Sequence, residues 1–407
     1  MTEKIIAPKG FLFAGISASI KKNPRKDLGL IFAEKDASAA AVFTTNLFQA
    51  APVVISKQRI QKGKARAILV NSGNANAGLG KKGVISALKT SKSLAKRLAI
   101  NESSILLAST GVIGEPFPDQ KIIAGIPELV AGLSPDRFND FEESIMTTDT
   151  RKKISYRSIK IKGKPVKLIG FAKGAGMIQP LMATMLGFVL TDAQIAPAIL
   201  RKILKESAEA SFNRLTIDGD TSTNDTLFAL ASGAGGARIS PASPGFQQFC
   251  EALRAVCLEL AAMIAADGEG ASRWYYVQVR GAGTKSDAEK IARRIANSPL
   301  VKTAISAADP NWGRVIAAAG IAGPKFDVNK TGVYLLGSRG KPRLQIFKSG
   351  ARSASYQGIE KEKQAVKILQ ESGFKIVFEA GKGKFDCEIV TCDFTEQYVR
   401  INADYRS

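Results

Sequence analysis

Two apolar segments that each run into a loop of small residues constrain the fold of this chain most. Residues 67–70 are aliphatic and precede a run of turn-forming residues, after which apolar side chains at helical spacing predict a helix over residues 84–98. Residues 105–108 repeat the strand pattern, which ends in a hydroxyl beside a glycine, at Thr110 and Gly111. The N-terminal part of the chain therefore alternates short strands, glycine-containing loops and helices.

Periodicity and turn signals predict further elements. A hairpin is expected between residues 159 and 168, with its turn at Gly163. Thr191 and Asp192 are expected to cap a helix that ends near residue 210. Ser286 and Glu289 have the spacing of a capping box and are expected to open another helix. The remaining predicted elements are strands over residues 28–33, 40–45, 185–190 and 274–279 and a helix over residues 246–266.

Composition indicates a soluble globular protein rather than a membrane protein. Hydrophobic residues make up 45% of the chain and charged residues 23%, and no apolar run approaches the roughly 20 residues that a membrane span needs. Residues 1–4 lack the charged-then-apolar plan of a signal peptide, so a cytoplasmic location is expected. With 407 residues the chain can bury a large core, in one large domain or in two.

The formal net charge of +22 raises the alternative of a nucleic-acid-binding protein. The 58 lysines and arginines are, however, scattered over predicted turns and exposed faces, with no basic block and no interleaved aromatic residues. A solvated basic surface that attracts anionic substrates is the favoured interpretation, and no nucleic-acid partner is expected. Retention on DNA with a steep dependence on salt would favour the alternative.

Cysteine and histidine usage limits the chemistry. The four cysteines show no C-x-x-C spacing, so neither disulfides nor a zinc site is expected. The carboxylates of residues 218–225 hint at a calcium loop, but that motif requires glycine where Thr223 stands and glutamate where Ala229 stands, so no metal is expected. The chain has no histidine, which excludes catalytic triads based on an imidazole. An acyl-transfer enzyme of this composition needs another base, and an N-terminal threonine supplies one in its own α-amine.

The stretch that begins at Lys173 suits such a nucleophile. A glycine-rich loop that carries this lysine runs through Pro180 into an apolar, strand-like segment, and a single hydroxyl, Thr184, stands where that segment starts. Two interpretations are open on these residues alone. Thr184 is either a polar residue satisfied within a buried strand, or the new N-terminus that self-cleavage after Ala183 exposes.

Several stretches in order along the chain resemble one family, the ornithine acetyltransferases of arginine biosynthesis, also called glutamate N-acetyltransferases. The resemblance covers nearly the whole chain. It is carried by residues 71–77, 109–115, 146–150, 173–192, 218–226, 267–270, 309–314 and 401–406. Each stretch is a weak signal by itself, whereas eight in the same order are highly specific.

The resemblance implies an α/β fold, a layered sandwich with mixed sheets flanked by helices. It also implies self-cleavage between Ala183 and Thr184 into an α chain, residues 1–183, and a β chain, residues 184–407, which assemble as an α2β2 heterotetramer. Thr184 would then take acetyl from N2-acetyl-L-ornithine and pass it to L-glutamate in a ping-pong cycle. No cofactor is implied, and the use of acetyl-CoA, which some family members accept as donor, is left open.

Site residues are carried over from the family by position. Thr110 and Gly111 would form the oxyanion hole. The residues implied to bind substrate are Thr147, Lys173, Glu269, Asn402 and Ser407, together with Thr184 itself. These residue types fit the chemistry, because a lysine suits a substrate carboxylate and a glutamate suits an amino group.

One other enzyme class stays open beside the acetyltransferase. Autoprocessed aminopeptidases and amidases share the fold and an N-terminal hydroxyl nucleophile. Lys173, Glu269 and Asn402 favour the transferase, because they suit an acetylated amino acid. Product analysis separates the two classes, since the transferase forms acetylglutamate and the hydrolase does not.

Overall fold

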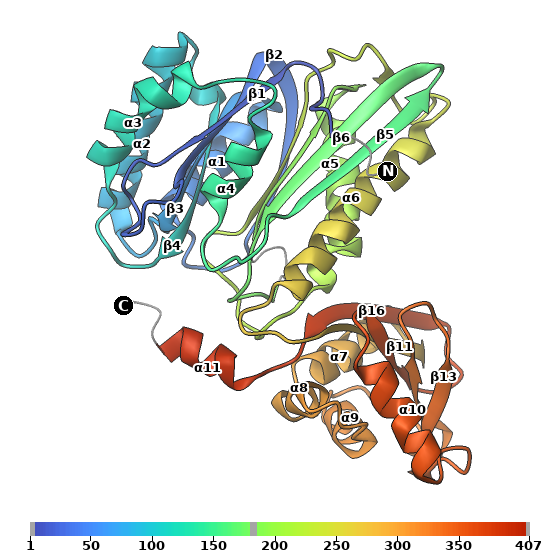
Figure 1. Ribbon diagram of the computed structural model, residues 1–407. Coiled ribbons are helices and arrows are strands. Elements are labelled where there is room, and N and C mark those ends of the chain that lie inside the picture. The colour runs from blue at the N-terminus through green and yellow to red at the C-terminus, as the bar shows by residue number, and fades with distance from the viewer. Residues whose placement is uncertain (1–4, 180–184, 404–407) are drawn as a thin grey trace. The chain divides into compact units, whose positions relative to one another are not determined.

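The computed structural model describes residues 5–179 and 185–403 (Figure 1). The chain divides into two compact units. Unit 1 comprises residues 1–213 and 220–264, and unit 2 comprises residues 214–219 and 265–407. The bond predicted to break, after residue 183, lies within the sequence of unit 1, so the two predicted chains do not coincide with the two units. No helix of the described residues is long and apolar enough to cross a membrane.

Unit 1 combines ten strands and six helices among its described residues. The strands are β1 (Phe11–Ile16), β2 (Leu28–Phe43), β3 (Lys64–Asn74), β4 (Ile105–Val112), β5 (Ile154–Ile161), β6 (Lys164–Lys173), β7 (Leu186–Thr191), β8 (Gln194–Ile195), β9 (Thr226–Ala231) and β10 (Arg238–Ile239). The helices are α1 (Ala51–Arg59), α2 (Gly80–Leu98), α3 (Asp119–Ala131), α4 (Phe138–Ile145), α5 (Pro197–Ala210) and α6 (Phe246–Ala266). Eight strands form one mixed sheet in the order β4-β3-β2-β9-β7-β6-β5, with β1 paired to β2, while β8 and β10 form a separate pair.

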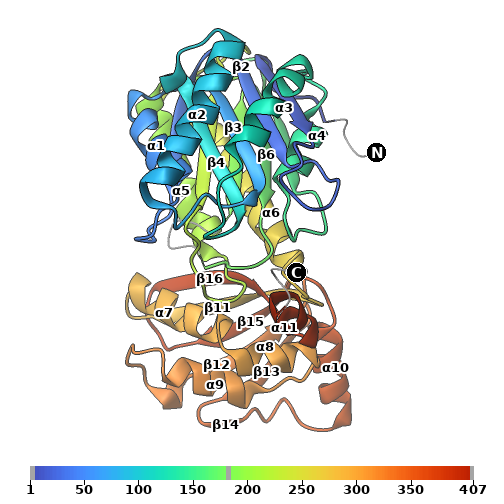
Figure 2. The same cartoon turned by 90° about the vertical axis from the view of Figure 1, so that its left-hand side faces the viewer.

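The large sheet folds over on itself to form a sandwich. Strand β2 pairs with β3 chiefly through its first half and with β9 through its second half. The register of β2 relative to β3 shifts between Phe32 and Ala37. An apolar core fills the space between the two halves, where the rings of Phe13 on β1 and Phe171 on β6 lie 5.7 Å apart. Helices α1 to α3 cover the outside of the β1–β4 half, and α5 and α6 lie outside the other half (Figures 1 and 2). The predicted layered α/β sandwich is confirmed.

Helix α4 contributes an aromatic anchor to this inner core. Phe141 is fully buried, and its ring centroid lies 5.4 Å from that of Phe171 and 5.2 Å from that of Phe188. Replacing Phe141 with alanine is expected to lower the free energy of unfolding by about 3–5 kcal/mol, because the truncation leaves a cavity in a packed core. Urea unfolding followed by circular dichroism measures the effect. The control is Phe48→Ala, at a side chain that is 80% exposed, and equal midpoints for the two variants would contradict the expectation.

Unit 2 has a second sheet whose helices gather on one face. Its strands are β11 (Trp274–Ala282), β12 (Gly332–Leu336), β13 (Arg343–Lys348), β14 (Ala351–Arg352), β15 (Phe374–Glu379) and β16 (Phe385–Cys392), in the order β14-β13-β12-β15-β11-β16. Its helices are α7 (Lys285–Ala296), α8 (Pro299–Ser306), α9 (Trp312–Gly320), α10 (Ile359–Leu369) and α11 (Glu396–Ala403). Helices α7 to α10 share one apolar core with alternate residues of the strands. The strand residues that alternate with these core residues, such as Tyr276, Lys375 and Glu388, give the other face of the sheet its polar character.

Most predicted elements are confirmed, but several boundaries are wrong. The strands expected over residues 28–33 and 40–45 are one long strand, β2. Thr191 and Asp192 do not cap α5: that helix begins at Pro197, and the Asp192 carboxylate instead accepts a hydrogen bond of 2.9 Å from the backbone N–H of Lys167. The cap of α7 is Thr284 rather than Ser286, because its side chain accepts the backbone N–H of Asp287.

Candidate active site

The carboxyl end of β4 carries the predicted oxyanion residues. Strands β3 and β4 run parallel, and Gly111 lies opposite Gly73 in their register. Gly111 has a φ of +132°, and a Cβ on it would lie 2.3 Å from the carbonyl carbon of Gly73. Glycine is required at this position, because the backbone of the neighbouring strand leaves no room for a side chain. Thr110, just before it, is buried.

Lys173, the last residue of β6, reaches this strand end. Its Nζ donates a hydrogen bond of 3.1 Å to Oγ1 of Thr110, and its side chain is largely buried. Four strands separate β4 from β6 in the order of the sheet, so the two residues meet only because the sheet folds into a sandwich. The structure thus brings together two residues for which the sequence predicted different roles.

The start of β7 lies next to Lys173. Strands β6 and β7 pair antiparallel, and Lys173 stands opposite the first residue of β7. Met185 is buried, and its carbonyl oxygen accepts a hydrogen bond of 3.0 Å from the backbone N–H of Thr226. The predicted nucleophile Thr184 and the cleavage bond after Ala183 lie outside the described residues, and their roles stay predictions.

Thr147 lies in the turn that follows α4, where Asp149 holds it. Oδ2 of Asp149 accepts hydrogen bonds of 2.8 Å from the backbone N–H of Thr147 and 3.4 Å from its hydroxyl. Oδ1 accepts a hydrogen bond of 2.6 Å from the backbone N–H of Gly174, the residue after Lys173. One carboxylate therefore links two predicted substrate-binding segments. The sequence pointed to Asp149 only as one acidic residue among the threonines of residues 146–150, and no role was predicted for it.

A buried lysine and a second carboxyl group lie behind Asp149. Nζ of Lys153 donates a hydrogen bond of 2.7 Å to Oδ1 of Asp149, and the two side chains are 1% and 0% exposed. Burial opposes ionisation of Asp149, but Lys173, Lys153 and the donated hydrogen bonds hold the pKa of this carboxyl well below its ordinary value. Burial raises the pKa of Glu142, which accepts the backbone N–H of Lys153, well above its ordinary value. Asp149 is thus the ionised member of the two carboxyl groups.

A cavity of about 660 Å³ opens beside Thr147. It is lined by Lys21, Arg25, Glu143, Met146, Thr147, Thr148, Asp149, Thr150 and Lys152. Nζ of Lys21 donates a hydrogen bond of 2.7 Å to the carbonyl oxygen of Met146, and burial lowers the pKa of Lys21 to about 8, although Asp27 opposes the shift. Three cationic side chains and two carboxylates, Glu143 and Asp149, line the cavity, and this excess of cations suits an anionic group such as a carboxylate. Nothing in the sequence distinguishes Lys21 from the many other lysines.

Asn224 fixes the backbone around the oxyanion residues. Its Nδ2 donates hydrogen bonds of 2.6 Å to the carbonyl oxygen of Ala75 and 2.8 Å to that of Ser109. The amide thereby ties the loop after β3 to the residue that precedes Thr110. The sequence singled out this stretch, residues 218–226, only as a failed calcium loop and as part of the family resemblance.

The remaining predicted substrate residues belong to unit 2. Nδ2 of Asn402, on α11, donates a hydrogen bond of 2.9 Å to Oε2 of Glu269, which is 7% exposed. The glycine turn of Glu269 packs tightly against α11, because a Cβ on Gly270 would lie 2.5 Å from the backbone nitrogen of Tyr398. The structure therefore pairs Glu269 with Asn402 across 133 residues of sequence. Ser407, predicted to act with them, lies outside the described residues.

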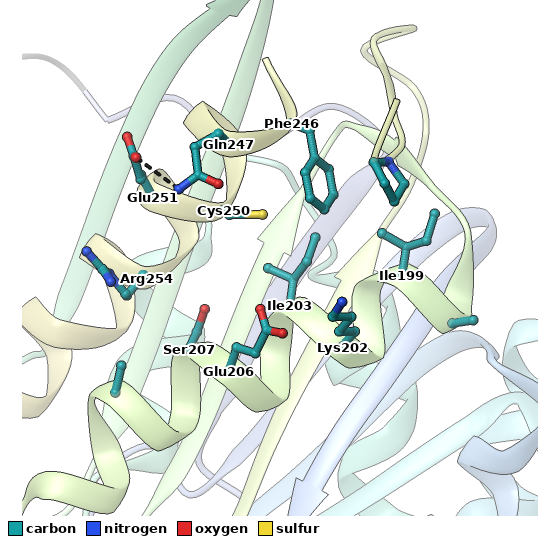
Figure 3. Close-up of a pocket in the computed structure, with 13 residues that line it drawn as sticks. Ile199, Lys202, Ile203, Glu206, Ser207, Phe246, Gln247, Cys250, Glu251 and Arg254 are labelled. Carbon is teal, nitrogen blue, oxygen red and sulfur yellow. Dashed lines mark hydrogen bonds between the residues drawn. The ribbon is translucent and has the colours of Figure 1, made fainter. Parts of the chain in front are cut away.

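A second cavity in unit 1 contains none of the predicted site residues. It measures about 420 Å³ and lies between α5 and α6, where Ile199, Ile203 and Phe246 form an apolar lining (Figure 3). Cys250 also lines it and is only partly buried, whereas Cys257, two turns further along α6, is fully buried. Residues 5–179 and 185–403 contain no cluster of three or more acidic or cysteine side chains that could hold a metal ion.

Comparison with known proteins gives one consistent result. A family model described as the ArgJ family matches residues 12–407. The arginine biosynthesis bifunctional protein ArgJ of Desulfotalea psychrophila is 46% identical over 400 residues, which cover 98% of this chain and 99% of that protein. The protein of the same name from Thermotoga neapolitana is 45% identical over 407 residues, which cover 99% of this chain and 100% of that protein.

Solved structures with similar sequences carry related names. A crystal structure of arginine biosynthesis bifunctional protein ArgJ from Bacillus halodurans is 37% identical, covers 54% of this chain and 99% of the solved chain, and has a TM-score of 0.49. The ornithine acetyltransferase of Mycobacterium tuberculosis, solved with ornithine, is 32% identical over 44% of this chain and 94% of the solved chain, with a TM-score of 0.39. The match of the family model over residues 12–407, together with the full-length relatives, confirms the resemblance seen in the sequence. The chain belongs to the ArgJ family.

Proposed function

We propose that this chain cleaves itself between Ala183 and Thr184, and that Thr184 then transfers acetyl from N2-acetyl-L-ornithine to L-glutamate. The contact between Lys173 and Thr110 carries the proposal, because a cation that suits a carboxylate and a hydroxyl that suits an oxyanion hole lie together beside the start of the strand that follows Thr184. Family membership supports the same function, since the full-length relatives are named as bifunctional proteins of arginine biosynthesis. The proposed enzyme is therefore an acyltransferase.

The proposed chemistry has two half-reactions. In the first, Oγ of Thr184 attacks the acetyl carbonyl carbon, and its proton passes to the α-amine of the same residue. Thr110 and Gly111 stabilise the charge on the carbonyl oxygen. The C–N bond breaks, the α-amine protonates the departing nitrogen, and ornithine leaves an acetyl ester on Thr184. In the second, the amine of glutamate attacks that ester, Oγ leaves and regains a proton through the α-amine, and acetylglutamate departs.

We assign the remaining contacts by charge. Lys173 and Thr147 bind a substrate carboxylate, and the excess of cationic over acidic side chains in the lining of the neighbouring cavity favours an anion there. Glu269, held by Asn402, binds the cationic end of ornithine or an α-amino group, and Ser407 completes this second group of residues. Acetyl-CoA is retained as an alternative acetyl donor for the same nucleophile.

We further propose that the two cleaved chains remain associated, as α2β2 heterotetramers in the cytoplasm. Strands β7 and β9, which follow the cleavage bond in sequence, lie in the sheet between β2 and β6, which precede it. Backbone hydrogen bonds of β2 with β9 and of β6 with β7 therefore join the two chains. All four cysteines are free, as in a reducing compartment.

The intact mass of the denatured protein tests the proposed maturation directly. Two chains that separate before Thr184 are the expected result, and a single uncut chain would contradict it. The cut protein is then incubated with acetylornithine, with and without glutamate. Acetylglutamate formed only with glutamate supports the transferase, whereas release of acetate without glutamate would support the amidase alternative.

Replacing Glu269 with glutamine tests the assignment of the cationic subsite. The amide keeps the size of the side chain and an acceptor for Asn402, but it loses the charge, so kcat/KM for acetylornithine is expected to fall about 10- to 100-fold, the value of one hydrogen bond to a charged group. Steady-state kinetics give the ratio. The matched control is Glu396→Gln, an 80% exposed carboxylate on the same helix as Asn402, and equal kinetics for the two variants would refute the assignment.

A further inference from the structure

We propose that Asp149 is a positioning residue that fixes Thr147 and Lys173 relative to each other. This inference rests on the function proposed above, because it concerns the residues assigned there to bind the substrate carboxylate. Asp149 itself faces Thr147, Gly174 and Lys153 and has a side chain that is 0% exposed. It therefore acts through its neighbours rather than as a catalytic group.

The geometry carries the proposal. The two oxygens of Asp149 receive two backbone N–H groups, one ammonium group and one hydroxyl, at distances between 2.6 and 3.4 Å. One of these N–H groups belongs to Thr147, and the other follows Lys173 directly. Since Nζ of Lys173 donates to Thr110, a shift of the β6 end would also disturb the oxyanion residue. One buried carboxylate thus controls three residues of the proposed site.

Only a carboxylate satisfies this set of partners. All four groups that hydrogen-bond to Asp149 are donors in the structure, and an ionised aspartate presents acceptors alone. An asparagine of the same size would turn an NH₂ group toward at least one of those donors, which forces the turn of Thr147 or the end of β6 to move. A misplacement of about 1 Å in such a segment can cost about 100-fold in rate.

Asp192 provides a control, because it binds the backbone near the start of β6, whereas Asp149 binds the residue that follows the end of β6. It is also a buried carboxylate, 2% exposed, and its Oδ1 accepts a hydrogen bond of 2.9 Å from the backbone N–H of Lys167 in β6. Lys167 stands seven residues before Gly174, about 23 Å along a strand. Asp192 also accepts the backbone N–H of Lys9 at 3.4 Å, so Asp192→Asn disturbs two hydrogen bonds of a buried carboxylate, against four for Asp149→Asn, without touching the proposed site.

The experiment compares Asp149→Asn, Asp192→Asn and the wild type as full chains. Turnover is expressed per mole of cut chain, so that slow maturation is not counted as slow transfer, and urea unfolding measures stability. We expect both variants to lose stability, but only Asp149→Asn to lose kcat/KM, by about 100-fold, with a higher KM and a lower kcat. Asp192→Asn is expected to keep both kinetic parameters.

Binding of acetylornithine keeps the proposal testable if Asp149→Asn does not mature. Calorimetry then compares Thr184→Ala with the double variant Thr184→Ala, Asp149→Asn, both of which are uncut, and we expect Kd to rise at least about tenfold in the double variant, the equivalent of one lost interaction of 1.4 kcal/mol. Unchanged turnover per cut chain, or unchanged Kd in the uncut pair, would overturn the positioning role. A wild type that forms no acetylglutamate would instead refute the proposed function.

Discussion

Replacing Thr184 with alanine is expected to yield a single uncut chain of full length with no detectable acetyl transfer. The substitution removes the hydroxyl proposed to attack both the preceding peptide bond and the acetyl group, and without cleavage no α-amine is freed to act as base. A chain without histidine has no imidazole to replace that amine. The loss of turnover is expected to reach at least about 10⁴-fold, as for other enzymes that lose their nucleophile. Denaturing mass spectrometry and the acetylglutamate assay measure the two effects.

The conservative variant Thr184→Ser separates the chemistry from the shape of the side chain. Serine keeps the hydroxyl and, after cleavage, the α-amine, so cut chains and measurable transfer are expected. Acetyl transfer by the uncut alanine variant would refute the proposal that Thr184 is the nucleophile. So would cleavage of the alanine variant at the same bond, since the hydroxyl would then not be the attacking group.

Replacing Gly111 with alanine is expected to damage both the fold of the site and the rate. The added Cβ would lie 2.3 Å from the carbonyl carbon of Gly73 and 2.5 Å from the nitrogen of Asn74, and neither backbone atom can move without shifting β3. The φ of +132° is also one that alanine rarely adopts. Alanine keeps the backbone N–H of residue 111, but the clash is expected to displace it, and a displaced oxyanion donor is expected to cost as much as a lost one, about 10²- to 10³-fold in kcat. Urea unfolding and kcat of the cut enzyme give the two readouts.

Gly320→Ala is the control for this substitution. Gly320 ends α9, and a Cβ there would meet no atom within 4 Å, so alanine at this position is expected to leave activity unchanged and to stabilise slightly. If Gly111→Ala matched Gly320→Ala in stability and in kcat, neither the close approach of the strands nor the oxyanion role could be maintained.

Local patterns in the sequence were sufficient to predict most elements, but not the way they join. The aliphatic run at residues 67–70 and the helical spacing at residues 84–98 are local signals, and the structure contains both elements. The long strand β2 was predicted as two, because its exposed residues around Asp36 read as a break although the strand continues through a register shift. The cap of α5 was misplaced because Asp192 is used by a distant backbone group.

The candidate site was predicted by resemblance rather than by spacing. Thr110 and Lys173 are 63 residues apart, and nothing in the intervening sequence shows that their side chains touch. Their contact depends on the folding of one sheet into two layers, a long-range property that periodicity does not report. Asp149 and Lys21 were missed for the same reason, because their significance lies in the groups that surround them. Glu269 and Asn402 were named without any indication that they pair.

Because β7 and β9 lie between β2 and β6 in the sheet, folding before the proposed cleavage differs from refolding after it. An uncut chain can fold in a single unimolecular process, with every strand of the sheet tethered to the next. If the bond before Thr184 is broken as proposed, the same sheet can be rebuilt only when two separate polypeptides meet, which makes refolding dependent on concentration. A mature enzyme that unfolds in dilute solution would therefore recover poorly, and its lifetime would be set by its rate of unfolding rather than by an equilibrium.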